Sequence, residues 1–224
     1  MTSMQHQGPR RLVVTDVDST FITDEVIELI ADHAGVRGLV AQVTERAMRG
    51  EIDFAQSLRQ RVATLEGLPV SVLDEVRDQL VFSPGAQELV AECQARGWPF
   101  GLISGGFEEV MGPVARSLGI RYLRANRLET RADAAGQKVL TGKVLGQIVD
   151  GQVKAQTLQE WAVAEGIPLE HCIAVGDGAN DLAMLALAGI GVAFRAKPVV
   201  QAQAPYAIDG SLCEVLDLLA CHRQ

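Results

Sequence analysis

Residues 13–20 read Val-Val-Thr-Asp-Val-Asp-Ser-Thr, an apolar run that ends in two acidic residues, Asp16 and Asp18, and a Ser-Thr turn. The apolar part predicts a buried strand over residues 11–16. At the carboxyl end of a parallel strand, a carboxylate can attack an electrophile or hold a cation. Taken alone, the pattern also fits an ordinary turn in which a Ser or Thr side chain caps the next element.

A second acidic loop lies far downstream, at residues 173–181, which read Ile-Ala-Val-Gly-Asp-Gly-Ala-Asn-Asp. An apolar strand again ends in a glycine-rich acidic loop, and a helix is expected to begin at Ala179. Two such loops in one α/β chain indicate a site for a hard cation with oxygen ligands. A purely structural binding module is disfavoured, because packing alone does not require repeated acidic loops.

The composition is that of a globular chain with an excess of negative charge. The 224 residues are 48% hydrophobic, and the formal net charge is −8. Because this charge repels phosphate backbones and anionic lipids, we expect no nucleic acid and no membrane among the partners. The longest uncharged apolar run, residues 182–194, is too short to span a bilayer. The four cysteines lack metal-binding spacing, so we expect reduced thiols in a cytoplasmic protein.

Strand and helix patterns alternate from about residue 81 onward, which predicts an α/β fold with a doubly wound parallel sheet. Further strands are expected at residues 100–103, 172–176, 190–194 and 207–208, with a hairpin formed by residues 120–128 and 139–145. Helices are expected at residues 83–97, 107–118, 152–165 and 211–221, in addition to the one that begins at Ala179.

The segment 23–80 differs from the rest because its pattern is helical throughout. Asp53 and Ser71 are predicted helix N-caps, and the apolar residues after Asp53 fall on one helix face. An insert directly after the first acidic loop would lie over the crevice as a lid. The sequence therefore predicts a polar tail at residues 1–10, a catalytic core at 11–22 and 81–224, and an inserted all-helical cap at 23–80.

Two more features suit a phosphate group near the acidic loops. The turn Ser104-Gly105-Gly106 enters a predicted helix and would present N–H groups, a hydroxyl and the positive end of a helix dipole. Lys154, near the start of another predicted helix, would neutralise a transferring phosphoryl group. Each has an ordinary alternative, a tight turn for the glycines and a solvated surface side chain for the lysine.

With these motifs in this order, the sequence resembles the haloacid-dehalogenase superfamily of aspartate-nucleophile phosphotransferases, and within it the phosphoserine phosphatase branch. Two further motifs narrow the resemblance to that branch. They are Gly-x-x-x-Phe-x-x-Ser-Leu-Arg-x-Arg-Val at residues 50–62 and Ala-Lys-Pro at residues 196–198. The resemblance covers about residues 11–220 and implies a Rossmann-like core with an inserted helical cap.

The resemblance implies roles for the acidic residues. Asp16 resembles the nucleophile that forms an aspartyl-phosphate, and Asp18 resembles the general acid that then becomes the base. Mg²⁺ would be held by the carboxylates of Asp16 and Asp177 and by the backbone carbonyl of Asp18. Asp181 would support these ligands, and Asn180 would contact the substrate or a water molecule.

The resemblance also implies how a substrate would be selected. Arg61 would clamp a carboxylate, Glu25 would bind an ammonium group, and Met48 and Phe54 would form an apolar shield. From the residues alone, Arg61 could instead extend to solvent or form an ion pair, Glu25 could simply favour a helix N-terminus, and the shield residues could be core. The phosphate-binding residues implied by the resemblance are Ser104, Gly105 and Lys154, with Gly106 in support.

Recognition of a carboxylate, an ammonium group and a phosphate together describes O-phosphoserine. We therefore expect hydrolysis of O-phosphoserine to serine and phosphate, the last step of serine biosynthesis, by a monomer or homodimer. Transfer to an acceptor such as homoserine, or hydrolysis of another small phosphomonoester such as phosphoethanolamine, is the alternative. A signalling receiver that stores phosphate on an aspartate is a different class, which Asp18 and the helical lid disfavour.

Overall fold

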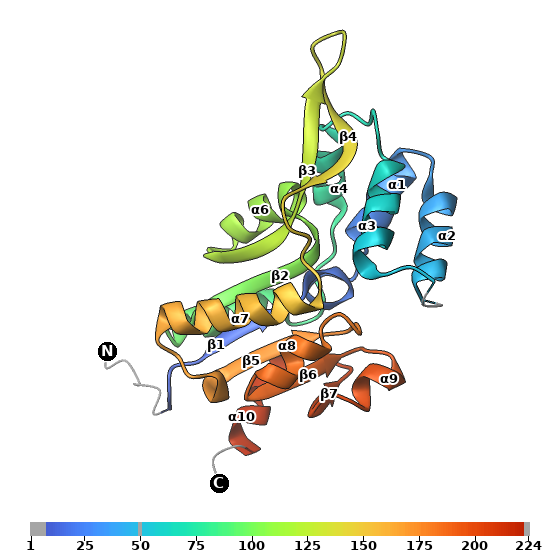
Figure 1. Ribbon diagram of the computed structural model, residues 1–224. Coiled ribbons are helices and arrows are strands. Elements are labelled where there is room, and N and C mark those ends of the chain that lie inside the picture. Colours follow the sequence, from blue (N-terminus) through green and yellow to red (C-terminus); the bar gives the residue numbers. More distant parts are fainter. Residues whose placement is uncertain (1–7, 49–50, 222–224) are drawn as a thin grey trace.

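The structure is a computed structural model that describes residues 8–48 and 51–221. Its centre is a seven-stranded sheet in the order β4-β3-β2-β1-β5-β6-β7 (Figure 1). Neighbouring strands are parallel except for β3 and β4, which form an antiparallel hairpin. The strands are β1 Leu12–Thr15, β2 Phe100–Phe107, β3 Tyr122–Ala132, β4 Lys138–Leu145, β5 Cys172–Gly176, β6 Ile190–Phe194 and β7 Tyr206–Ile208.

Strand β1 lies in the middle of the sheet. Its three apolar residues and one threonine suit this position, and all four are buried. It pairs in parallel with β2 on one side and β5 on the other. Val13 faces one core cluster, whereas Leu12 and Val14 face the other. Both faces of the sheet are therefore covered by helices, as the alternating pattern predicts.

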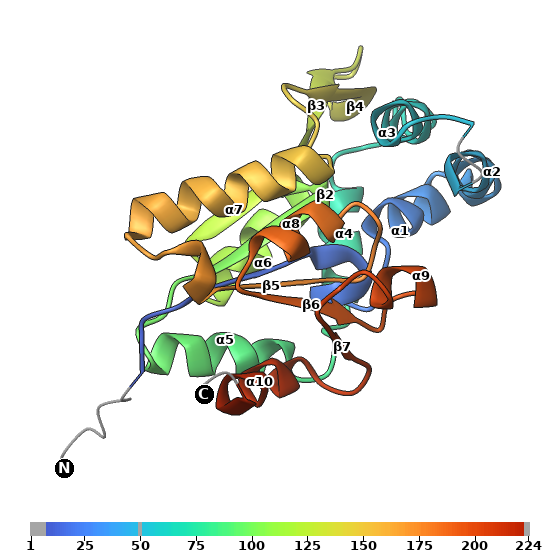
Figure 2. The same ribbon diagram turned by 60° about the horizontal axis from the view of Figure 1, so that its bottom comes forward.

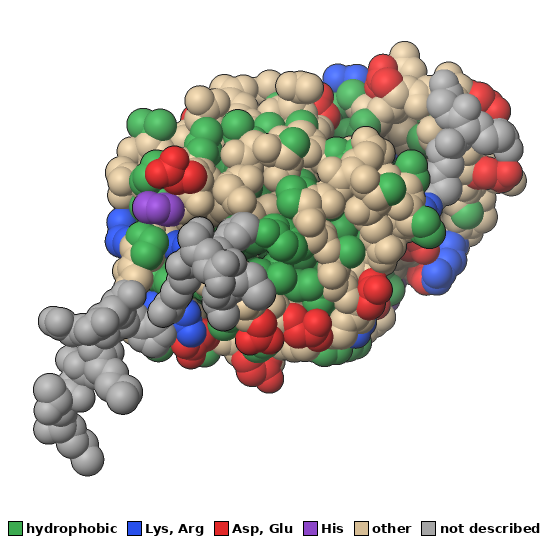
Figure 3. Space-filling view, turned by 90° about the horizontal axis from the view of Figure 1, so that it is seen from below, with side chains coloured by type: hydrophobic (Ala, Val, Ile, Leu, Met, Phe, Trp, Pro, Cys, Tyr) green, Lys and Arg blue, Asp and Glu red, His purple; other side chains and the backbone are tan. Residues whose placement is uncertain are grey.

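Helices lie on both faces of the sheet, with α7 and α8 on one side and α5 on the other (Figure 2). The core helices are α5 Ala86–Ala95, α6 Glu108–Ser117, α7 Gly151–Glu165, α8 Leu182–Leu187, α9 Pro198–Gln201 and α10 Leu218–Cys221. Among the described helices, none is both long and apolar enough to cross a membrane. On the face at the lower end of Figure 1, hydrophobic side chains are scattered among uncharged surface, and charged side chains lie mainly toward the edges (Figure 3).

The described residues of the predicted insert, 23–48 and 51–80, form four helices beside the carboxyl end of β1 (Figure 1). They are α1 Val26–His33, α2 Arg37–Met48, α3 Phe54–Ala63 and α4 Val72–Gln79. The chain leaves and re-enters the core at one place, because Ile22 bridges to Phe82. Asp53 caps α3 by accepting from the Gln56 N–H at 2.7 Å, as predicted. Ser71 is the N-cap residue of α4, as predicted, but its side chain makes no capping hydrogen bond.

The insert has a second attachment that its helical pattern does not predict. Leu140 of β4 accepts from the Gly67 N–H and donates to the Leu68 carbonyl, both at 2.9 Å. The Val70 N–H donates to the Lys138 carbonyl, also at 2.9 Å. Residues 67–70 therefore extend the hairpin by a short strand-like pairing, so segment 23–80 is not helical throughout.

Three predicted helices differ from the structure. The helix expected from Ala179 begins at Leu182, because Asp181 closes a turn by accepting from the Gly178 N–H at 3.0 Å. The helix expected at residues 211–221 is divided into a 3₁₀ turn, η3 Leu212–Leu216, and the short α10. The helix expected from residue 83 begins at Ala86, after Gly85 adopts a left-handed conformation with φ +80°.

Candidate active site

The first acidic loop leaves the centre of the sheet in a tight turn. The Asp16 N–H donates to the Val175 carbonyl at 2.8 Å, which continues the pairing of β1 with β5 by one residue. Residues 17–21 then form a tight turn, η1, which the Ile22 N–H closes by donating to the Val17 carbonyl. The backbone of Asp18 and Ser19 within this turn is not helical. This turn places Asp18 on the same cavity as Asp16, as the sequence predicts for two carboxylates at a strand end.

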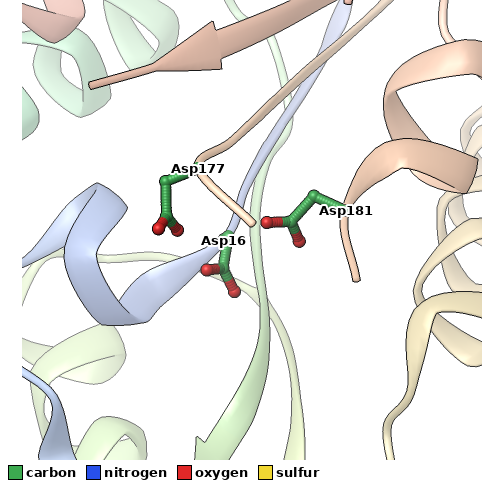
Figure 4. Close-up of side chains that lie close together, drawn as sticks. All are labelled: Asp16, Asp177 and Asp181. Carbon is green, nitrogen blue, oxygen red and sulfur yellow. The ribbon is translucent and has the colours of Figure 1, made fainter. Parts of the chain in front are cut away.

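Three carboxylates from the two acidic loops meet at this edge of the sheet. Each of Asp16, Asp177 and Asp181 has an oxygen within 4.8 Å of the others. Figure 4 shows the three side chains lying close together, with Asp181 reaching toward the other two. Thr20 donates to Asp177 Oδ1 at 3.1 Å and so links the loops directly. The two acidic loops thus converge, as predicted. The negative charge of their three carboxylates suits a divalent cation.

Lys154 is the positive charge at the base of this cluster. Its Nζ donates to Asp16 Oδ1 at 2.5 Å and to Asp181 Oδ1 at 2.6 Å, and its side chain is fully buried. Burial alone would lower the pKa of Lys154, but the two carboxylates reverse this effect and raise the pKa above its usual value. Lys154 is therefore a buried ammonium group, and the alternative of a solvated surface lysine is wrong.

The pKa values of the carboxylates reflect burial among like charges. Burial raises the pKa of Asp16 well above its usual range, Asp181 raises it further, and Lys154 opposes both effects. Burial raises the pKa of Asp18 to about 8, with Glu25 contributing. Burial raises the pKa of Asp177 to about 6, with Asp181 contributing. The site thus favours either bound protons or a cation that offsets the negative charge.

The turn predicted at residues 104–106 is part of strand β2, which extends beyond the predicted 100–103 to Phe107. The pairing of β2 with β3 shifts register between Ile103 and Phe107. This irregular segment, called the glycine turn below, lies against Asp18. Ser104 is fully buried, and its Oγ accepts from the Gly106 N–H at 2.7 Å. A Cβ atom at Gly106 would lie 2.8 Å from Asp18 Oδ2, and one at Gly105 would lie 2.9 Å from Phe54 Cζ. Both glycines are therefore required by close contacts, one with the acidic loop and the other with the insert.

Asn126 on β3 holds this turn in place. Its Nδ2 donates to the Gly105 carbonyl at 2.8 Å, and its Oδ1 accepts from the Val149 N–H at 2.9 Å, just before α7. The residue is 2% exposed. Asn126 was missed from the sequence, although a polar side chain between Ala125 and Leu128 in a predicted strand is a usable signal. Its two bonds connect the glycine turn to the helix that carries Lys154.

A cavity of about 150 Å³ opens between the acidic loops and the insert. Phe54, Leu58 and Arg61 reach it from one face of α3, as their spacing predicts. Its lining residues are Asp16, Asp18, Glu25, Ile27, Phe54, Leu58, Arg61, Gly105, Gly106, Asp177, Gly178 and Asn180. The predicted residues Ser104, Lys154 and Asp181 lie behind this lining. The side chain of Met48 lies outside the described residues.

Glu25 and Arg61 bring opposite charges to the insert side of the cavity. Protein atoms around the Glu25 carboxylate raise its pKa by desolvation, and a hydrogen bond from Ser19 Oγ at 2.8 Å opposes this effect. Burial lowers the pKa of Arg61, while Glu25 opposes the change. Arg61 forms no ion pair among the described residues, and its Nε donates only to the Ser57 carbonyl of its own helix, at 3.4 Å. The guanidinium is therefore positioned to meet a ligand.

The chain matches the haloacid dehalogenase-like hydrolase family over residues 13–186. Together with the convergent acidic loops, this match shows that the chain belongs to that family. Its branch is that of the phosphoserine phosphatases, as its relatives show. The phosphoserine phosphatase of Streptococcus thermophilus is 50% identical over 209 residues, which cover 93% of this chain and 95% of that protein.

Two further relatives define the extent of the similarity. The phosphoserine phosphatase of Streptomyces coelicolor is 49% identical over 98% of this chain, but the match spans only 52% of that longer protein. The solved structure of a substrate-bound phosphoserine phosphatase complex is 37% identical, with a TM-score of 0.86, and covers 95% of this chain and 99% of its own. These matches confirm two predictions: the resemblance that was inferred from the motifs, and the fold class.

Proposed function

We propose that this protein hydrolyses O-phosphoserine to serine and phosphate, with Mg²⁺ as cofactor and an aspartyl-phosphate on Asp16 as intermediate. One observation carries the proposal: a single small cavity has Asp16 and Asp18 on one side and Glu25 and Arg61 on the other. O-phosphoserine offers a phosphate to the first side and an ammonium and a carboxylate to the second. The likeness to a substrate-bound phosphoserine phosphatase supports this assignment.

The acidic cluster fits Mg²⁺ as the cofactor. Carboxylate oxygens are the ligands that Mg²⁺ prefers, and Asp16 and Asp177 would supply them, with the carbonyl of Asp18 as a further ligand. Asp181 already accepts from Lys154 through Oδ1 and from the Gly178 N–H through Oδ2. This double engagement supports a role for Asp181 beside the metal ligands. When bound, Mg²⁺ would reduce the repulsion between the nucleophile and the phosphate dianion.

In the first half of the reaction, an Asp16 carboxylate oxygen attacks phosphorus and the bond from phosphorus to the serine oxygen breaks. Asp18 donates its proton to that oxygen, a role that suits a carboxyl group with a pKa of about 8. Lys154 and the Gly105 N–H of the glycine turn offset negative charge on the phosphoryl group, while the Gly106 N–H donates to Ser104 Oγ. The solved phospho-aspartyl intermediate analogue of phosphoserine phosphatase, 37% identical with a TM-score of 0.85, supports this step.

In the second half, the Asp18 carboxylate removes a proton from a water molecule, whose oxygen attacks phosphorus. The bond from phosphorus to Asp16 breaks, which releases phosphate and restores both carboxyl groups to their starting states. Asn180, on the cavity wall, would contact the substrate or this water. One carboxyl group thus serves as acid and then as base.

We assign residues 11–22 and 81–224 to a catalytic core and residues 23–80 to a cap that closes the site. The supporting observation is that Phe54 of the cap packs on Gly105 of the core, where both line the cavity. Closure would exclude water during the first half of the reaction. We further propose a cytoplasmic monomer or homodimer that acts in serine biosynthesis.

The test is phosphate release from a panel of amino-acid and amino-alcohol phosphomonoesters, with Mg²⁺ or with EDTA. We expect O-phosphoserine to be the best substrate and EDTA to stop its turnover. If no phosphate were released from O-phosphoserine, the proposal would be refuted. Faster phosphate release from phosphoethanolamine would favour a phosphatase that does not bind a substrate carboxylate. Added homoserine tests for transfer, because a phosphotransferase would form phosphohomoserine.

A further inference from the structure

Ser19 has an unusual backbone conformation in the middle of the catalytic loop. Its φ is +56° and its ψ is +3°, on the left-handed side of the conformational map. Residues with a Cβ atom rarely adopt this region, and glycine is the usual choice there. Strained residues of this kind cluster at functional sites, so the Ser19 side chain merits a functional explanation.

The Ser19 hydroxyl contacts the group proposed to select the substrate. Its Oγ donates to Glu25 Oε1 at 2.8 Å, and the Ser19 N–H donates to the Asp24 carbonyl at 3.2 Å. Glu25 precedes α1 but makes no capping bond to that helix. Asp18 contacts the start of this helix instead, because its Oδ1 accepts from the Val26 N–H at 3.5 Å. The Glu25 side chain is therefore oriented by the catalytic loop and not by its own helix.

We propose that Ser19 is a positioning residue for substrate specificity, whose hydroxyl fixes the Glu25 carboxylate to receive the substrate ammonium group. Glu25 lines the cavity and is exposed, so without a partner its long side chain would sample several rotamers. A carboxylate has about four acceptor positions, so one bond from Ser19 leaves capacity for an ammonium group. This inference rests on the proposed function.

A matched pair of substrates separates positioning from a general structural role. O-phosphoserine and 3-phosphonooxypropanoate differ only in that the second lacks the ammonium group. In Ser19→Gly, we expect KM for O-phosphoserine to rise about tenfold, as for the loss of one hydrogen bond, with kcat changing much less. KM for 3-phosphonooxypropanoate should change by less than about threefold. Ser19→Ala should show the same loss of preference.

Two further variants make the test specific. Glu25→Gln should lower the preference for O-phosphoserine in the same direction, and Ser19→Gly in that background should add little, because both act on one interaction. Ser19→Gly should unfold at a temperature no lower than the wild-type protein, because glycine suits φ +56°. This stability readout separates lost positioning from a disrupted loop.

The outcomes distinguish this inference from the proposed function. Wild-type protein that does not release phosphate from O-phosphoserine would refute both. Wild-type protein that does so, with a Ser19→Gly variant that keeps its preference or loses activity equally on both substrates, would overturn only the role of Ser19. A selective rise in KM for O-phosphoserine, absent for the ammonium-free ester, would support it.

Discussion

Asp16 is the side chain at which the buried lysine and the acidic cluster meet, so its substitution tests the proposed chemistry most directly. We expect Asp16→Asn to abolish phosphate release, because an amide neither attacks phosphorus nor binds Mg²⁺ well. The fold should survive, since the amide resembles the protonated carboxyl group that burial favours at this position, and Lys154 keeps its bond to Asp181. Steady-state phosphate release and circular dichroism measure the two expectations.

Asp18→Asn provides the matched comparison. This variant keeps the backbone carbonyl proposed as a metal ligand but loses the proton donor, so turnover should fall by about 10²- to 10⁴-fold while Mg²⁺ affinity is largely retained. Activity retained by Asp16→Asn would assign the nucleophile elsewhere. Lost Mg²⁺ affinity in Asp18→Asn would contradict the separation of roles.

Arg61 tests the proposed selection of a carboxylate. We expect Arg61→Ala to raise KM for O-phosphoserine by about 10- to 100-fold, the range for a lost charge-assisted hydrogen bond. KM for p-nitrophenyl phosphate, which has no carboxylate, should change much less. Arg59→Ala is the control, because Arg59 is exposed on the same helix and does not line the cavity. Equal effects of Arg61→Ala on both substrates would indicate a structural arginine.

Among individual site residues, those that the sequence predicts best are the charged residues at strand ends. Asp16, Asp18 and Asp177 were predictable because parallel strands end at one edge of a sheet. The hydrogen bonds made by Asn126, Thr20 and Ser19 were not, because they join segments whose contacts the sequence pattern does not specify. The burial of Lys154 was also not predictable without knowing that two carboxylates enclose it.

At the scale of elements, the apolar strands were the most predictable parts. Strands at residues 172–176 and 190–194 have the predicted bounds, since continuous apolar runs flanked by loops fit only buried strands here. Helix ends were less predictable because side-chain bonds decide them. The Asp181 carboxylate delays the start of α8, and Asp53 but not Ser71 forms a side-chain cap.

The β3–β4 hairpin supports the insert, and two of its glycines make that support testable. Gly142 has φ +75°, and a Cβ there would lie 3.2 Å from Ala63 of α3. Gly136 has φ +80° but no neighbour within 4 Å. Gly136→Ala should therefore cost only backbone strain, about 1 kcal/mol, whereas Gly142→Ala should lower the free energy of unfolding by roughly 1 kcal/mol more. Urea unfolding compares them.

The same pair of variants reports on the site. If the hairpin holds the insert against the core, Gly142→Ala should also raise KM for O-phosphoserine, because α3 carries Arg61 and Phe54. Gly136→Ala should leave KM unchanged. Equal losses of stability in the two variants would argue against a packed hairpin–insert contact.

For the molecule as a whole, the site belongs to no single segment. Strand ends supply the carboxylates, α7 supplies Lys154, β2 supplies the glycine turn, and the insert supplies Glu25 and Arg61. Packing these groups into one cavity places several acidic side chains near one another. This arrangement opposes folding unless protons or a cation reduce the charge. Stability and function are therefore linked through the same carboxylates.

This linkage predicts an unusual pH dependence for the EDTA-treated protein. The folded state raises the pKa of Asp18 to about 8 and that of Asp177 to about 6, whereas an unfolded aspartate titrates near 4. Between these values the folded state binds more protons, so the stability from each group is full below about pH 4 and is lost as pH rises through the folded pKa. The free energy of unfolding should thus be higher at pH 5.5 than at pH 8.

Urea unfolding at the two pH values, with and without Mg²⁺, checks the expectation. Saturating Mg²⁺ should stabilise the protein more at pH 8 than at pH 5.5, because the ion competes with protons for the carboxylates. Asp18→Asn should reduce the pH difference in the EDTA-treated protein, since an amide does not titrate. A free energy of unfolding that is equal or lower at pH 5.5 would show that the cluster does not hold protons as its burial requires.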